Sequence, residues 1–236
     1  MKNEKVLRDS FSLNELFKTH FESLILSQSQ MIQADSENTR KLKTTEKEIQ
    51  KADAEKIFPA LNDKQVLKYI YLENPTQKQN EYIKTFRRKN SGLLLCETNG
   101  AANSYIIHHL HFVIISEKPC VHYPIYLYPD FPKAGRTLNF NNKILKKISL
   151  KLALEFLPEE PTSGNVCFIQ NPDVRDDFKT YYTPDHLLNY LLFFLKKENK
   201  HLDKKTRIPF PNEEDFWACV RKGEKLRSAS LSQEEN

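Results

Sequence analysis

The first part of the chain alternates apolar and polar residues at helical spacing. Ser12 and Glu15 have the spacing of a capping box, in which each side chain satisfies a free backbone amide at a helix start. Apolar residues then recur every three or four positions, which predicts a helix from about residue 13 to 33. Residues 36–56 are almost wholly polar and form either a solvated helix or a flexible linker.

Two further helical segments are predicted before residue 90. The first has Asn62 as its cap, and Val66, Leu67, Ile70 and Tyr71 share one face. It ends at Asn74-Pro75, because a residue before proline is driven out of the helical conformation. The second covers about residues 77–89. Residues 1–90 are therefore interpreted as a helical extension.

The middle of the chain changes to patterns typical of strands. Segments 92–98, 105–115 and 121–128 are dense in β-branched and aromatic residues and are separated by turn signals, and residues 137–140 are a possible fourth strand. These segments predict a strand meander. The pattern over residues 142–156 fits a helix or a strand equally well.

The last part of the chain returns to helices. Thr183 has the position of an N-cap and Pro184 that of the first helical residue. A final helix opens at Asn212 and is expected to close near Gly223. The resulting expectation is an α+β fold, with a main domain over residues 91–200, a C-terminal helix over 201–226 and a disordered tail over 227–236.

The overall composition allows a packed core but identifies no partner. Hydrophobic residues make up 39% of the chain, and 36 basic against 31 acidic residues give a net charge of +5. This surplus is too small, and its clusters are too short, to predict a nucleic-acid partner. The longest apolar run, over residues 187–195, is too short to cross a bilayer, and no secretory signal is recognised, so a cytoplasmic protein is expected.

The four cysteines are the residues of this sequence with the clearest potential for covalent chemistry. Cys96, Cys120, Cys167 and Cys219 lack CxxC spacing, which argues against a zinc site. In a reducing cytoplasm all four are expected as free thiols. Cys167 is the best candidate for a nucleophile, because it follows a turn-rich loop that could expose it. The alternative is a buried cysteine in a short core strand.

The segment around Cys167 resembles the ubiquitin-conjugating enzyme family. The proline-containing turn YLYPDFP at residues 126–132 is similar to one in that family. LPEEPTSGNVC at residues 157–167 matches the spacing from the family's His-Pro-Asn motif to its cysteine, with Pro158, Gly164 and Cys167 in register. YTPDHLLNYLLFFL at residues 182–195 resembles the helix that follows. The resemblance covers roughly residues 92–200.

Two motif residues of the family are replaced here. Leu157 stands in place of the motif histidine, and Glu159 in place of the asparagine that stabilises the oxyanion, where an ionised carboxylate would repel developing charge. Some bacterial relatives use a histidine placed after the cysteine, and His186 is the candidate for that role. Pro158 and Gly164 would shape the loop.

The resemblance implies thioester chemistry in a bacterial conjugation system. Cys167 would accept the C-terminus of a ubiquitin-like modifier from an activating, adenylating enzyme, and His186 would orient or deprotonate the attacking amine. Some such systems act in anti-phage defence. No cofactor and no metal are implied, and the target protein is not specified.

Three alternatives stay open. A catalytically inactive relative of the same fold would act as an interaction module. A metal-binding barrel is suggested by His109 and His111, which share a strand face, together with Glu117 and His122. A nucleic-acid-associated protein is suggested by the basic surplus, but no recognition motif accompanies it.

Overall fold

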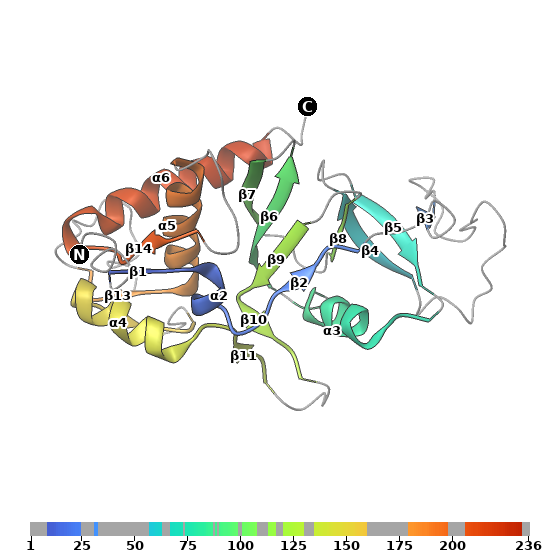
Figure 1. Ribbon diagram of the computed structural model, residues 1–236, viewed down its shortest axis with the longest axis horizontal. Helices are drawn as coiled ribbons and strands as arrows, with labels where there is room; N and C mark the ends of the chain where they lie inside the picture. The colour runs from blue at the N-terminus through green and yellow to red at the C-terminus, as the bar shows by residue number, and fades with distance from the viewer. Residues whose placement is uncertain are drawn as a thin grey trace. The chain divides into compact units, whose positions relative to one another are not determined.

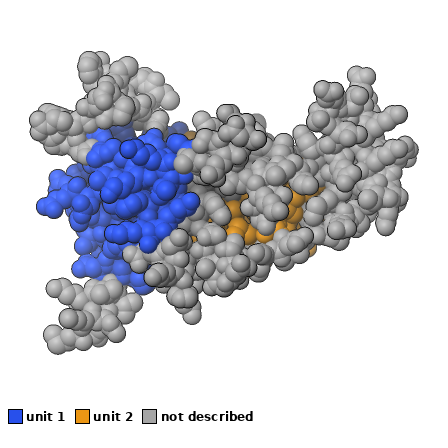
Figure 2. Space-filling view, turned by 90° about the horizontal axis from the view of Figure 1, so that it is seen from above, with its two compact units in different colours: residues 1–19, 100–106, 138–236 blue, residues 20–99, 107–137 orange. Residues whose placement is uncertain are grey.

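The structure, a computed structural model, is a mixed α+β fold with five helices among the described residues (Figure 1). It describes residues 9–24, 31–32, 57–62, 67–72, 74–86, 88, 90–98, 101–107, 113–116, 120–129, 135–159, 179–197 and 206–232. The predicted α+β class is confirmed. The chain separates into two compact units (Figure 2), of which unit 1 comprises residues 1–19, 100–106 and 138–236, and unit 2 comprises residues 20–99 and 107–137.

Unit 1 is mainly helical. Its elements are β1 (Ser10–Phe11), α2 (Leu13–Leu16), α4 (Asn142–Leu152), β12 (Glu155–Phe156), β13 (Tyr181–Tyr182), α5 (Pro184–Lys197), β14 (Ile208–Pro209) and α6 (Glu213–Ser232). Strand β1 pairs antiparallel with β14, and β12 pairs parallel with β13. Apolar side chains from every one of the helices are buried in this unit, among them Leu16, Ile148, Leu191 and Phe216.

The contact between α5 and α6 depends on a glycine. A β-carbon placed on Gly223 of α6 would lie 1.9 Å from the backbone oxygen of Asn189 in α5. No side chain can occupy that space, so glycine permits a close approach of the two helix backbones. In Figure 1, α6 runs across α5.

Unit 2 is mainly β-structure. Its elements are β2 (Phe21–Glu22), β3 (Met31–Ile32), β4 (Ile57–Asn62), β5 (Leu67–Tyr71), α3 (Gln77–Phe86), β6 (Gly92–Thr98), β8 (Val113–Ile115), β9 (Cys120–Pro124) and β10 (Tyr126–Leu127). Strands β7 (Ala101–Ile107) and β11 (Thr137–Leu138) cross the sequence boundaries between the units. One core cluster joins α3 to side chains of β2, β4, β5 and β8.

The strands of unit 2 do not pair in chain order. Strand β9 lies between β2 and β6 and is antiparallel to both, whereas β8 pairs in parallel with β4. The strand 92–98 is confirmed to the residue as β6. The predicted meander is wrong, because β8 is hydrogen-bonded in a different sheet from the strands that precede and follow it.

The predicted long helix at residues 13–33 is also wrong. The capping box of Ser12 and Glu15 is present, but the helix it starts, α2, ends at Leu16. The next backbone amides have partners far along the chain: Lys18 N–H donates to the backbone oxygen of Asn139, and Thr19 N–H donates to the Asn139 side-chain oxygen, each at 2.9 Å. These contacts replace the hydrogen bonds that a continuing helix would need.

Three other predictions are corrected or resolved. The helix expected after Asn62 is wrong, because β4 and β5 form an antiparallel pair there in which Ile70 faces Phe58. The ambiguous segment 142–156 begins with α4, capped by Asn141. Helix α6 continues past Gly223 to Ser232, into the tail expected to be disordered. The predicted helix after residue 76 is confirmed as α3.

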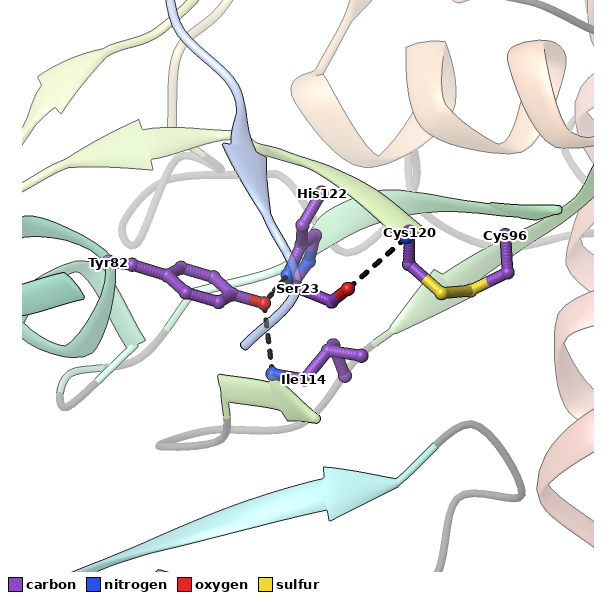
Figure 3. Close-up of a disulfide and its surroundings, with 6 residues drawn as sticks. All are labelled: Ser23, Tyr82, Cys96, Ile114, Cys120 and His122. Atoms are coloured by element: carbon purple, nitrogen blue, oxygen red, sulfur yellow. Dashed lines mark hydrogen bonds between the residues drawn. A yellow bond between two sulfur atoms is a disulfide. The ribbon is translucent and has the colours of Figure 1, made fainter. Parts of the chain in front are cut away.

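Cys96 and Cys120 form a disulfide, which corrects the expectation of four free thiols (Figure 3). The two residues face each other across β6 and β9, with their α-carbons 4.1 Å apart. The Cys120 backbone N–H and C=O are both bonded to Ser23, on the opposite side from β6. Cys96 and Cys120 are therefore a non-hydrogen-bonded pair, the position at which facing side chains are closest.

Candidate functional site

The loop that carries Cys167 is closed at its base by a pair of short parallel strands. Glu155 N–H donates to the Thr180 backbone oxygen at 3.0 Å, and Leu157 N–H donates to that of Tyr182 at 2.9 Å. The two ends of the segment that contains Cys167 therefore lie side by side. Helix α5 begins two residues after the returning strand. Cys167 itself lies outside the described residues.

The loop entry is exposed. Pro158 and Glu159 lie one residue after the end of β12, and both are exposed to solvent. Gly164, the other residue predicted to shape the loop, lies outside the described residues. A carboxyl group in this position can attract a basic or amine-bearing group, but it opposes a developing oxyanion.

His186 lies in the first turn of α5, immediately after the loop returns. Its Nδ1 atom accepts a hydrogen bond from Thr183 N–H at 3.1 Å and lies 3.3 Å from the Thr183 hydroxyl oxygen. The Thr183 hydroxyl in turn faces the His186 backbone N–H at 3.5 Å. Because Nδ1 accepts a backbone N–H, the neutral ring carries its proton on Nε2. In this tautomer Nε2 is a donor and not a base.

Burial keeps His186 neutral. Desolvation lowers the pKa of His186 to about 4, against a smaller opposing effect of Asp185. The ring meets Trp217 of α6 edge to face, with the ring centroids 5.0 Å apart. The ammonium group of Lys179 lies 4.3 Å from the Trp217 ring. Trp217 of α6 therefore contacts both the His186 ring, at the start of α5, and Lys179, which precedes β13.

The contact between Thr183 and His186 has the form of a capping box with histidine in the place of glutamate. The same reciprocal arrangement joins Ser12 to Glu15 at the start of α2, and Thr76 to Gln79 at the start of α3. The sequence predicts Thr183 as the cap but does not indicate the role of His186, because the known signature requires Glu or Gln. A Thr-x-x-His pattern at a helix start is the signal that could have found it.

A second histidine, His122, is completely buried in unit 2, and Figure 3 shows its ring beside the Tyr82 hydroxyl. The Tyr82 hydroxyl is hydrogen-bonded to His122 Nδ1 at 3.0 Å and accepts from Ile114 N–H at 2.9 Å. Nε2 has no hydrogen-bond partner in the described part of the chain. Burial lowers the pKa of His122 to about 3 and raises that of Tyr82. Both side chains are buried in the core of unit 2, so this pair is not accessible to a substrate.

Of the four residues suggested as metal ligands, only His122 lies among the described residues, and it is not available to bind a metal. His109, His111 and Glu117 lie outside the described residues, and His122 is sealed in the core with Nδ1 occupied. Among the described residues no three His, Cys, Asp or Glu side chains come together as a metal site.

Cys219 in α6 provides an internal reference thiol. It is a free cysteine and is partly buried. Burial, followed by the charge of Asp215, raises the pKa of Cys219, so it forms little nucleophilic thiolate at neutral pH.

Comparison with known proteins assigns no relative: no family model, no curated protein and no solved structure matches the chain. Over the described residues, no helix combines the length and the apolar character needed to cross a bilayer.

Proposed function

We propose that this chain carries the C-terminus of a ubiquitin-like protein as a thioester on Cys167. The observation that supports the proposal most directly is the β12–β13 pair, which closes the Cys167 loop beside the first turn of α5. A loop closed at its base lowers the entropy lost when it holds a thiol in one position. The proposal rests on this loop and not on the sheets, whose strand order differs from a meander.

The proposed transfer of the modifier takes two steps. In the first, the Cys167 thiolate attacks the carbonyl carbon of the modifier's thioester with an activating enzyme; a new C–S bond forms, the old one breaks, and the enzyme's thiolate leaves. In the second, a target amine attacks the carbonyl carbon, a C–N bond forms, the C–S bond to Cys167 breaks and the amine proton passes to solvent.

His186 is a positioning residue in this proposal. Its Nδ1 caps α5, so Nε2–H can donate a hydrogen bond but cannot remove a proton from the amine without losing the cap. Its contribution is to fix the returning end of the loop through Thr183.

The test uses a short peptide ending in Gly-Gly as a thioester of a small thiol, followed by intact-mass spectrometry. The wild type is expected to gain one acyl group that hydroxylamine removes. Cys167→Ser should abolish this adduct, whereas Cys219→Ser, the matched control, should keep it because the Cys219 thiol is poorly ionised. An adduct that persists in Cys167→Ser, or a wild type that is not acylated, would contradict the proposal.

Two substitutions of His186 separate capping from chemistry. His186→Gln should preserve the cap, since Gln79 fills the same position at the start of α3, and should retain acylation. His186→Ala should lower the stability of unit 1 by about 1 kcal/mol through loss of the cap. Loss of acylation in His186→Gln with unchanged stability would instead assign the ring a direct chemical role.

A second candidate is an interaction module of the same fold without the chemistry. It is favoured by the exposed Glu159 in the asparagine position and by the use of the His186 ring as a cap. An unacylated, slowly alkylated Cys167 in the same experiment would support the module.

A further inference from the structure

The outer face of α4 is uniformly basic around one exposed leucine. Lys143, Lys146, Lys147 and Lys151 all lie on the side of the helix opposite its buried residues. Leu150 lies among them and is 83% exposed, an exposure at which an apolar side chain gains nothing from the fold. We call these five residues the lysine–leucine face.

This pattern does not stabilise the helix that carries it. Lys143, Lys147 and Lys151 are spaced four apart, where like charges repel, and α4 contains no acidic residue that could offset them. Lys143 also lies in the first turn, where the helix dipole disfavours a positive charge. The face is therefore better explained by a contact outside the fold than by the stability of α4.

Only one side of the face is occupied within unit 1. Lys151 pairs with Asp9 at 3.0 Å, and the Lys147 ammonium lies 4.2 Å from the Phe210 ring. Within the described chain, the side chains of Lys143 and Lys146 have no acidic partner. Two lysines and the leucine thus present a free cationic and apolar surface to solvent.

We propose that the lysine–leucine face binds an acidic segment of a partner protein, with an apolar side chain of that segment packed against Leu150. Carboxylates of the partner would pair with Lys143 and Lys146, which have no acidic partner among the described residues. Exclusion of water around the leucine would strengthen these ion pairs, which are weak at an open surface.

The exposed leucine favours a protein over other anionic partners. Contacts with nucleic-acid phosphates are made by charged and polar groups, for which Leu150 provides nothing. A helix that lies on a membrane inserts an apolar face, but the apolar face of α4, with Leu145, Ile148 and Leu152, is buried in unit 1. An acidic, leucine-containing peptide segment matches both features of the surface.

The test measures binding of a labelled acidic peptide with leucines at helical spacing by fluorescence anisotropy, beside the same peptide with serine for leucine. The double variant Lys143→Glu/Lys146→Glu is expected to weaken binding of the leucine peptide roughly tenfold or more, which corresponds to about 1.4 kcal/mol. Leu150→Ser should weaken binding of the leucine peptide and leave the serine peptide unchanged. The matched control, Lys222→Glu/Lys225→Glu on α6, reverses as many charges elsewhere on unit 1 and should bind as the wild type.

Several outcomes would overturn the proposal. These are an unaltered affinity in Leu150→Ser, an equal loss in the α6 control, or tighter binding of duplex DNA or of phosphatidylserine vesicles that depends on Lys143 and Lys146. The thioester proposal is separate, because Cys167→Ser should bind the peptide as the wild type does.

Discussion

Among the described residues, each unit has one buried or half-buried imidazole with a hydrogen bond at its Nδ1 atom, but the two bonds are of different kinds. His186 in unit 1 accepts from Thr183, three residues away, and the contact is completed within the first turn of α5. His122 in unit 2 is hydrogen-bonded to Tyr82, forty residues away, and only the packing of α3 against the sheet brings them together. The local cap therefore needs only the start of one helix, whereas the non-local pair needs the packed core of unit 2.

The same contrast extends to the rest of each unit. Unit 1 is built from capped helices and from the crossing of α5 and α6, and unit 2 from strands joined across long sequence separations and fixed by the Cys96–Cys120 bond. The two units are thus expected to respond differently to mutation, reduction and acid.

The largest expected effect is on the helix crossing in unit 1. Gly223→Ala should destabilise that unit by about 3 kcal/mol, because its β-carbon would lie 1.9 Å from a backbone oxygen that cannot move aside. The gain of about 1 kcal/mol from helix propensity is too small to offset this clash. Chemical denaturation followed by Trp217 fluorescence measures the change.

Alanine substitutions at two other glycines, Gly92 and Gly135, serve as controls for Gly223→Ala. Gly92→Ala should disturb unit 2 instead, since its β-carbon would lie 2.6 Å from His122 Nε2 and 2.8 Å from the Tyr123 backbone oxygen. Gly135→Ala meets nothing within 4 Å and should change stability by less than about 0.5 kcal/mol. Equal effects at all three positions would contradict the packing described here.

Reduction should weaken unit 2 selectively. The Cys96–Cys120 bond closes a loop with a sequence separation of 24 residues, and its loss should lower the stability of unit 2 by about 3 kcal/mol. The comparison is between oxidised and reduced wild type by hydrogen exchange, with the double variant Cys96→Ala/Cys120→Ala as a protein that reductant cannot change. Faster exchange in α5 and α6, with β6 and β9 unaffected, would refute this expectation.

Acid should destabilise unit 2 through His122. Its pKa is about 3 in the folded protein and 6.5 in the unfolded chain, so the unfolded chain takes up the proton first and stability falls as the pH drops below 6.5. The loss reaches about 2 kcal/mol at pH 5 and stops growing below the folded pKa.

Two variants assign this pH dependence. His122→Phe should remove its share of the loss between pH 7 and pH 5. His186→Gln should remove a share of the same sign and of nearly the same size over this range, because the folded pKa of His186, about 4, also lies below pH 5; the two shares separate only below about pH 4, where only the loss due to His122 still grows. A pH profile unchanged by His122→Phe would show that the buried ring is not responsible.

The sequence predicted what depends on neighbours along the chain. The Ser12–Glu15 box, the Thr183 cap with Pro184 after it, and the start of α6 after Asn212 each involve residues within one helical turn, so a local pattern is sufficient. Strand β6 was predicted for the same reason, from a run of apolar and β-branched residues.

The candidate site was predicted only in part. The position of His186 in the first turn after the loop follows from the sequence, but its hydrogen bond to Thr183 and its contact with Trp217 do not. The surroundings of Cys167 stay a prediction, because that residue lies outside the described part of the chain. The exposure of Leu150 could not be predicted, because the periodicity does not decide between helix and strand over residues 142–156.

By itself, then, the sequence determined where α2, α3, α5 and α6 begin, that residues 92–98 form a strand, and that helices and strands occur in one chain. Tertiary structure alone decided that the helix after Ser12 stops at Leu16, that Leu67–Tyr71 is a strand, and that Cys96 meets Cys120. The physical reason is common to these cases. Each depends on backbone or side-chain partners distant in sequence, such as Asn139 for Lys18 and Thr19, and those partners are chosen by packing rather than by local preference.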